Sequence, residues 1–349
     1  MVPKVTVIIP SYNMGHMLVE AVQSLLGQTY QDWNAIVVDD GSEDDTRRLM
    51  GPFLSDRISY VWQPNAGVAA ALNTGLAQAS SAYISFLAAD DLLLPDAMEQ
   101  QARVLDAHAD VALVFGQAYE IDPSGNIWGT RVPFGAETLN VLASSESVPR
   151  LLKKNFIICS TVMLRQSFVE GTGTFDASLD TGGEDWEFYL RLAARGPIAY
   201  LPRPLAKYLI HDGSLTARLA VTPKGESDRQ RMLDTFFAGP DVQRLFGHLE
   251  RMAQAYLHYH FSQLAASRRQ KRAAVRHFVK ATYLRPQLWM GAGGWSMAYA
   301  LTKAFLPAWL VQAARLTRRM IGRDRLHHGV ALAYRSDRAS RGLSGGPRG

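Results

Sequence analysis

Two adjacent carboxylates, Asp90 and Asp91, directly follow an apolar run over residues 83–87 that predicts a short buried strand. Neighbouring carboxylates repel each other, and a desolvated carboxylate needs a cation or strong hydrogen-bond donors. A divalent cation such as Mg²⁺ or Mn²⁺, which prefers oxygen ligands, meets both needs. The alternative is that the pair only caps a helix that begins near Pro95. The residues therefore predict either a metal site or a helix cap.

A second carboxylate pair, Asp39 and Asp40, follows the strand-like run over residues 33–38, and Tyr12 follows the first such run just after Pro10. An aromatic ring can stack on a flat base, and a carboxylate can accept the imide N–H that uracil offers. The alternatives are a helix N-cap for the pair and a plain surface position for the tyrosine. No Gly-x-Gly-x-x-Gly follows the first strand, so a dinucleotide site loses its main support.

These polar clusters are positioned by strands and helices that alternate along the chain. Strands are predicted over residues 4–10, 33–38, 58–63 and 83–87, and helices over 17–28, 45–50 and 67–79. Further on, we expect helices over 97–106 and 184–192 and strands over 111–118, 156–164 and 198–210, the last of them broken by prolines. The alternation predicts an α/β fold with a parallel, doubly wound sheet, whose ligands bind beyond the carboxyl ends of the strands.

The composition is that of a globular protein of one large domain with an appended element, or of two domains. The chain has 349 residues, of which 47% are apolar, and its one cysteine, Cys159, excludes a disulfide framework and suits a reducing cytosol. The apolar run at the amino terminus is too short for a signal sequence. We therefore expect a cytoplasmic location.

The net charge of +5 hides an asymmetry between the two parts of the chain. Residues 1–219 carry 15 Lys and Arg against 25 Asp and Glu, whereas residues 220–349 carry 22 against 7. A basic tail that follows an acidic site in the sequence is not the charge pattern of a nucleic-acid-binding surface. It predicts a tail that faces something anionic, with a membrane surface as the leading candidate.

Seven short motifs occur in a fixed order over residues 4–216: VTVIIPSYN at 5–13, SLLGQTY at 24–30, VVDDGS at 37–42, NAGV at 65–68, FLAADD at 86–91, GEDWE at 183–187 and HDGS at 211–214. Together they resemble the family 2 glycosyltransferases of the GT-A fold. The resemblance implies a Rossmann-like, mostly parallel sheet flanked by helices. It also implies a nucleotide-sugar donor, a divalent metal (Mn²⁺ or Mg²⁺) and hexosyl transfer with inversion at the anomeric carbon.

The resemblance also assigns roles to residues at the strand ends. It implies that the base is held by Pro10, Tyr12 and either Asp39 or Asp40, that Asn65 and Asn73 line the donor pocket, and that Asp91, with Asp90, makes the metal and ribose contacts. Two positions depart from the pattern of many members. Ala88 stands where another acid is common, and Leu72 stands where an arginine is common, so the metal must rely on Asp91 and the donor diphosphate.

Two further residues complete the predicted site. Asp185 is the candidate general base, because a sugar hydroxyl is a poor nucleophile and a positioned carboxylate can remove its proton. The alternative is that the acids of this motif only favour a helix amino terminus. His211 resembles a ligand to the metal or the diphosphate, although a lone histidine is also common as a surface or core residue. The glycine-rich stretch over 171–183 can serve as a lid.

The chain beyond residue 219 has a different character. We expect a catalytic domain over residues 1–219, a helical extension over 220–333 and a disordered tail over 334–349, rich in Arg, Ser and Gly. The apolar run over 288–314 contains glycines and a proline, so it favours an interfacial or re-entrant membrane segment over a full span. A small helical bundle or a dimer interface is the alternative.

These observations predict an inverting, metal-dependent glycosyltransferase that moves a sugar from a nucleotide donor, with UDP as the expected nucleotide, to a lipid-linked or growing surface polysaccharide of the cell envelope. Its partners would be the donor, the glycan acceptor and an anionic membrane, with a cytoplasmic or peripheral location and no nucleic acid. A nucleotide-sugar-binding scaffold that has lost turnover is the alternative. A nucleotidyltransferase is disfavoured because no glycine- and lysine-bearing phosphate loop lies near the first strand.

Overall fold

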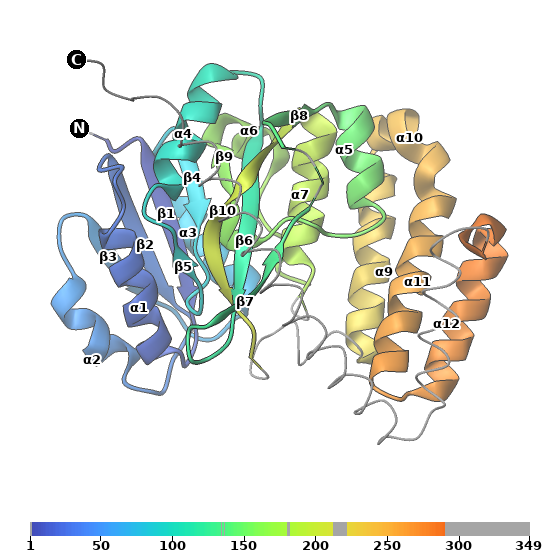
Figure 1. Cartoon of the computed structure of the whole chain (residues 1–349), viewed down its shortest axis with the longest axis horizontal. Coiled ribbons are helices and arrows are strands. Elements are labelled where there is room, and N and C mark those ends of the chain that lie inside the picture. Colours follow the sequence, from blue (N-terminus) through green and yellow to red (C-terminus); the bar gives the residue numbers. More distant parts are fainter. Residues whose placement is uncertain (1, 134, 136, 180–181, 212–221, 290–349) are drawn as a thin grey trace, which may run out of the picture.

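The computed structural model describes residues 2–133, 135, 137–179, 182–211 and 222–289 (Figure 1). Its sheet contains the strands β1 Val5–Ser11, β2 Trp33–Asp39, β3 Ile58–Trp62, β4 Tyr83–Phe86, β5 Leu92–Leu93, β6 Leu113–Ile121, β7 Ile127–Arg131, β8 Asn140–Leu142, β9 Met163–Arg165 and β10 Ile198–Leu209. The helices are α1 Gly15–Leu26, α2 Thr46–Met50, α3 Val68–Gln78, α4 Ala97–Ala107, α5 Ser144–Leu151, α6 Gln166–Thr172, α7 Glu184–Arg195, α9 Pro223–Ala238, α10 Pro240–Phe246, α11 Glu250–Ser267 and α12 Lys271–Leu284.

The strands form one mixed sheet in the order β3-β2-β1-β4-β9-β6-β10-β5. The run from β3 to β4 is parallel throughout, as predicted from the alternation of strands and helices. Beyond it, β9 runs antiparallel to both β4 and β6, while β6 and β10 are parallel to each other. The predicted α/β architecture with a helical carboxyl-terminal region is confirmed, and the sheet is less uniformly parallel than the alternation alone suggested.

Both faces of the sheet are covered by helices, and β1 shows why its sequence is continuously apolar. Val7 and Ile9 pack into one cluster with residues of α1 and α4, whereas Ile8 packs into the opposite cluster with residues of α3 and α7. All three side chains are fully buried. A strand in this position needs apolar side chains on both faces, and burial of each contributes about 1.5–3 kcal/mol.

The strand predicted over residues 156–164 is wrong over most of its length. Residues 159–161 form a 3₁₀ turn, and only the short β9 that follows joins the sheet. The Asn155 side chain accepts a hydrogen bond from Ile157 N at 3.1 Å, and Thr161 Oγ1 donates to Ile158 O at 2.8 Å. Such local side-chain bonds compete with ladder pairing, so this apolar stretch turns instead of extending.

The helices α9 to α12 form a further layer on the α7 side of the sheet, at the end of the molecule opposite β3 (Figure 1). Met232 and Phe236 of α9 and Phe261 of α11 share one core with Phe188 of α7. The helical region is therefore packed on the part of the chain that carries the sheet, as the bundle alternative predicted. None of the described helices is long and apolar enough to cross a bilayer.

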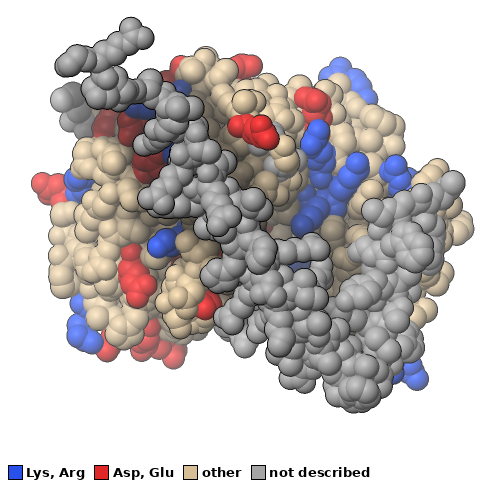
Figure 2. Space-filling view, in the orientation of Figure 1, with Lys and Arg blue, Asp and Glu red and all other residues tan. Residues whose placement is uncertain are grey.

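Several predicted features lie outside the described residues. These are the Asp-Gly-Ser that follows His211, the centre of the predicted lid at 180–181, most of the linker before α9, the apolar run from residue 290 onward and the tail over 334–349. On the face shown in Figure 2, Lys and Arg side chains gather toward the carboxyl-terminal helices, in line with the charge asymmetry of the sequence.

Candidate active site

Asp90, Asp91 and His211 meet at one edge of the sheet, although 121 residues separate the histidine from Asp90. His211 Nε2 lies 3.0 Å from Asp90 Oδ2, where it can donate a hydrogen bond. Asp91 is buried, and its carboxylate accepts hydrogen bonds from Ser160 Oγ at 2.6 Å and from Leu209 N at 3.0 Å. Burial, and secondarily the charge of Asp90, raise the pKa of Asp91 to about 7.

The end of β10 is placed here by two prolines within the strand. The pairing of β10 with β6 shifts register on both sides of Pro204. Proline has no N–H for the ladder, so bulges form where it interrupts a strand. The chain then regains its pairing and brings the Leu209 amide to Asp91, followed by His211.

The second carboxylate pair lies at the end of β2, and both of its members are buried and bonded locally. Asp39 accepts hydrogen bonds from Ser42 N at 2.8 Å and from the Tyr60 hydroxyl. Asp40 accepts from Gln63 Nε2 at 2.7 Å and from the backbone N–H groups of residues 66 and 67 at 2.9 and 2.8 Å. The pair therefore holds the loop after β3 against the end of β2, which is more than a helix N-cap would do.

The loop after β1 is held at the end of β2 as well, by hydrogen bonds of Asn13. Asn13 N donates to Ser42 Oγ, and Asn13 Oδ1 accepts from Glu43 N, both at 2.8 Å. Gly41 has a φ of +80°, and a Cβ there would lie 2.7 Å from Asn65 N, so only glycine fits between the two loops. Next to these contacts Pro10 ends β1, and the side chains of Tyr12 and Asn65 are exposed, Tyr12 by 44%. Those two side chains are open to a ligand.

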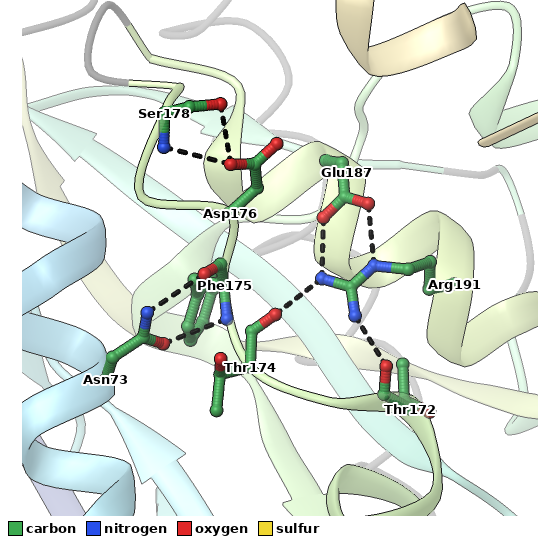
Figure 3. A network of polar contacts seen from close by, with 8 residues as sticks. All are labelled: Asn73, Thr172, Thr174, Phe175, Asp176, Ser178, Glu187 and Arg191. Carbon is green, nitrogen blue, oxygen red and sulfur yellow. Dashed lines mark hydrogen bonds and ion pairs between the residues drawn. The ribbon is translucent and has the colours of Figure 1, made fainter. Parts of the chain in front are cut away.

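Asn73 of α3 makes two hydrogen bonds that its predicted role, lining the donor pocket, did not include. Its Nδ2 donates to Phe175 O, and its Oδ1 accepts from Phe175 N, both at 2.9 Å (Figure 3). This two-way bond ties the chain after α6 to α3. A direct contact of Asn73 with the donor stays a prediction.

The same segment is held from its other side by an ion pair of α7. Arg191 forms a two-pronged salt bridge with Glu187, with both N–O distances 2.6 Å, and donates to Thr172 O and Thr174 O at 2.7 Å (Figure 3). Glu187 is buried, so this planar, charge-assisted pairing is geometrically specific. The first half of the predicted lid is thus anchored to α3 and α7.

Asp185 lies in the first turn of α7, where Asn155 Nδ2 donates to its Oδ2 at 3.2 Å and Trp186 N donates to its Oδ1 at 2.6 Å. Burial raises the pKa of Asp185, and these two donors and the charge of Arg229 work against that rise. Glu184 beside it is buried with Oε2 unpaired among the described residues, and burial, then the charge of Asp185, raise the pKa of Glu184 to about 8. Burial therefore disfavours the charged form of both carboxyl groups, and Glu184, with a pKa of about 8, is mostly a neutral acid near pH 7.

Of the predicted site residues, Asp91 and Asp185 line a cavity of about 860 Å³, and Asn155 lines it with them. The segment over 155–160 connects them, since its first residue holds Asp185 and Ser160 holds Asp91. The thiol of Cys159 also lines the cavity, and burial raises its pKa, so it stays protonated. The sequence reasoning missed Asn155 and Ser160 because it placed them at or inside a strand.

The helical region also reaches this cavity, which the sequence reasoning did not foresee. Arg229 of α9 and His260 of α11 line it, together with Lys154 from the loop after α5. The basic composition of the tail was the available signal. It was interpreted as pointing toward a membrane rather than toward the site.

Asp90, Asp91 and His211 are the residues that could hold a divalent cation. The carboxylate oxygens of Asp90 and Asp91 are suitable ligands for such a cation, and a bound cation would offset the burial and the charge of Asp90 that raise the pKa of Asp91. Within the described part of the chain, however, no group of three or more His, Cys, Asp or Glu side chains is arranged to hold a metal ion. A cation here would need ligands from its substrate, as Mg²⁺ often takes them from a phosphate.

Comparison with known proteins shows similarity to glycosyltransferases. Residues 6–172 match the family model described as glycosyl transferase family 2. The chain is 34% identical over 166 residues to the UDP-Glc:alpha-D-GlcNAc-diphosphoundecaprenol beta-1,3-glucosyltransferase WfgD of Escherichia coli, covering 47% of this chain and 61% of WfgD. It is 28% identical over 213 residues to an E. coli chondroitin synthase, covering 60% of this chain and 29% of the synthase.

The matched part accounts for 34% to 66% of the length of four rickettsial glycosyltransferases, which are 29% to 32% identical to it. Among solved structures, S. aureus TarS 1–349 in complex with UDP-GlcNAc has a TM-score of 0.63 at 16% identity, covering 86% of this chain and 89% of TarS 1–349. The mannosyltransferase PcManGT of Pyrobaculum calidifontis, with GDP-Man and Mn²⁺, has a TM-score of 0.52 at 20% identity, with 86% of each chain covered. These structures share the GT-A fold.

Proposed function

The chain belongs to the family 2 glycosyltransferases, and on that premise we propose that it is an inverting enzyme. It transfers a sugar from a nucleotide donor, preferably UDP-linked, to a hydroxyl group of a glycan or lipid-linked acceptor. The observation that carries this proposal is the single cavity lined by both Asp91 and Asp185. Asp91 suits the diphosphate of a donor, through a bound cation, and Asp185 suits the hydroxyl group of an acceptor.

Asp185 serves as the general base in this proposal. It accepts the proton of the acceptor hydroxyl as the oxygen attacks the anomeric carbon, a contribution of about 10²–10⁴ in rate. Asn155 Nδ2 and the amide N–H of Trp186 orient the carboxylate from two sides. A single displacement with one base inverts the anomeric configuration and needs no covalent carboxylate intermediate.

The donor lies along the ends of β1, β2 and β4 in this proposal. Tyr12 stacks on the base, and Asn65 and Asp39 or Asp40 lie beside it, in loops that the hydrogen bonds described above hold in place. WfgD, a 34% identical relative, is named for UDP-Glc, which favours uracil as the base. Asp90, Asp91 and His211 would hold Mn²⁺ or Mg²⁺ on the donor diphosphate. A divalent cation bound there stabilises the charge of the leaving nucleoside diphosphate.

The test is calorimetric titration of the purified chain with UDP and GDP, each with and without Mn²⁺, followed by a screen of UDP-sugars for UDP release. We expect Mn²⁺-dependent binding of UDP in preference to GDP, at least about tenfold weaker in Asp91→Ala because a buried charged contact is lost. Failure of both nucleotides to bind with metal present would contradict the donor site. Tight binding without turnover of any donor would favour the inactive scaffold.

We further propose a peripheral location at an anionic membrane. Val275, Val279 and Tyr283 of α12 are 40%, 57% and 77% exposed and recur every four residues, so they form one apolar stripe on the helix surface. Arg272 and Lys280 are also exposed on this helix. The full chain should sediment with phosphatidylglycerol vesicles but not with phosphatidylcholine vesicles, and Val279→Asp should reduce sedimentation. Equal behaviour on both lipids would contradict this location.

A further inference from the structure

Basic side chains from three separate parts of the chain line the acceptor end of the cavity. Arg229 comes from α9, His260 comes from α11, Arg268 follows the end of α11, and Lys154 comes from the loop after α5. Two of these elements belong to the helical region, which the donor site described above does not use.

Arg229 lies close to the start of α7. A methyl group added to Gly182 would lie 3.9 Å from Arg229 Nη2, and one added to Gly183 would lie 3.8 Å from Arg229 Cγ. The φ of Gly183, +109°, is one that other residues rarely adopt, so the backbone here can pass close to the guanidinium. The one hydrogen bond that Arg229 makes to a described residue is a long contact of 3.4 Å from Nη1 to Gly225 O. Within the described ranges, the other N–H groups of this guanidinium make no hydrogen bond.

His260 and Lys154 line the same cavity as this guanidinium. His260 Nε2 donates to Lys153 O at 2.6 Å, so the neutral ring presents Nδ1 as an acceptor. Burial lowers the pKa of His260, and the charges of Lys154 and Arg229 lower it further against the effect of the Lys153 carbonyl. Both cations are thus near enough to His260 to disfavour its charged form.

Arg229 borders Asp185 rather than Asp91. Arg229 is the cation that acts on Asp185 and Glu184, whereas Arg131 is the cation that acts on Asp91. Arg131 is in addition paired with Glu120 at 2.7 Å and lies over the ring of Tyr208 at 4.5 Å. Arg131 is therefore the arginine of the donor end, near Asp91. Arg229, from the helical region, lies at the acceptor end, near Asp185.

We propose that Arg229, supported by Lys154, binds a phosphate group of the acceptor, so that the enzyme acts on a phosphorylated acceptor. This inference rests on the proposed function. A guanidinium presents several N–H donors in a plane and binds phosphate oxygens in pairs, while a lysine adds an adjacent point charge. The phosphate belongs either to a diphosphate that links the accepting sugar to a lipid or to a phosphodiester within a glycan. In both cases it places the accepting hydroxyl near Asp185.

The experiment is calorimetric titration of the full chain in metal-free buffer with EDTA, so that binding at the proposed metal site is suppressed. The probes are geranyl diphosphate, the uncharged geraniol and the diester glycerophosphoglycerol. The variants are Arg229→Gln, Arg229→Lys and Lys154→Gln, with Asp91→Ala as the donor-site control and Arg244→Gln as a control cation. Arg244 is an exposed residue of α10 that pairs with Asp241, away from the cavity lining.

We expect saturable binding of geranyl diphosphate but not of geraniol. Affinity should fall at least about tenfold in Arg229→Gln, because a charge-assisted hydrogen bond is lost, and should partly return in Arg229→Lys. Lys154→Gln, at an exposed position that folding does not depend on, should fall by a few-fold. The Asp91→Ala and Arg244→Gln variants should bind as the wild type does. Binding of the diester as tight as that of the diphosphate identifies a phosphorylated glycan, and weaker binding identifies a lipid diphosphate.

Equal affinity in the wild type and Arg229→Gln, or loss of binding in Asp91→Ala, would overturn this inference. No binding of either phosphate probe would overturn it as well. The donor titration separates this failure from that of the proposed function. Arg229→Gln should bind UDP with Mn²⁺ as the wild type does, and a wild type that binds no UDP contradicts the enzyme assignment itself.

Discussion

The proposed donor side and the proposed acceptor side of the site are built in different ways. On the donor side, Ser160 holds Asp91 from 69 positions away and Leu209 holds it from 118. On the acceptor side, Asn155 holds Asp185 from 30 positions away, and the next residue of α7 donates to the same carboxylate. The metal end of the donor side therefore depends on the packing of the whole chain, whereas the carboxylate of the acceptor side is oriented by nearer segments.

The largest effect should come from the acceptor side. Asp185→Asn keeps the shape of the side chain but removes the base, so kcat should fall about 10³-fold, within the 10²–10⁴ range of general base catalysis. Donor binding, which depends on the other side, should be nearly unchanged. The measurement is UDP release together with UDP titration. A collapse of UDP affinity in this variant would contradict both the assignment of the base and the separation of the two sides.

A smaller loss should follow from removing the residue that orients this base. Asn155→Ala deletes the hydrogen bond to Asp185 Oδ2, so kcat should fall about tenfold while UDP affinity is kept. Because that bond lowers the pKa of Asp185, its removal raises the pKa, and the acid limb of the kcat–pH profile should move to higher pH. An unchanged profile with lower kcat would mean that Asn155 only supports the local chain.

The next prediction concerns protein stability and the two hydrogen bonds between Asn73 and Phe175 in Figure 3, which join α3 to the segment after α6. Asn73→Ala removes both bonds to the Phe175 backbone and leaves a partly buried N–H and C=O without that partner, so unfolding free energy should fall by about 1–3 kcal/mol. Denaturant unfolding measures this. Ser178→Ala, in the exposed turn of the same segment, is the matched control and should stay within about 0.5 kcal/mol. Similar values for the two variants would show that the tie to α3 adds little.

The smallest expected effect concerns the helical region alone. His258 and His277 face each other with their Nδ1 atoms 3.0 Å apart, and Glu226, Arg276 and Lys280 are the other charged groups near them. Burial, followed for His258 by the charge of His277, lowers the pKa of both rings, that of His258 to about 4.

Since the unfolded histidines take up protons near their usual pKa of about 6.5, stability should be full above that pH and fall as the pH drops toward about 4. The melting temperature should decrease by a few degrees over this window. His258→Gln should flatten that decrease, because glutamine does not titrate. A wild-type dependence that persists unchanged in this variant would assign the loss to carboxylates elsewhere.

Much of this protein follows from its sequence alone. Apolar periodicity and turn residues are local properties, so the strands β1 to β4, the helices between them and the placement of Asp39, Asp40, Asp90 and Asp91 at strand ends could all be predicted. Those patterns also indicated the α/β class and the family resemblance, since each motif lies within a few residues.

The tertiary structure decided the rest. Asn155 faces Asp185 across 30 residues, Asn73 reaches Phe175 across 102, and Arg229 of the basic tail enters the cavity of the catalytic part. No periodicity in the sequence reports such pairs, because which side chains meet depends on how the helices and the sheet pack against one another. For the same reason the stretch over 156–164 looked like a strand by composition but forms a turn whose Ser160 holds Asp91 in place.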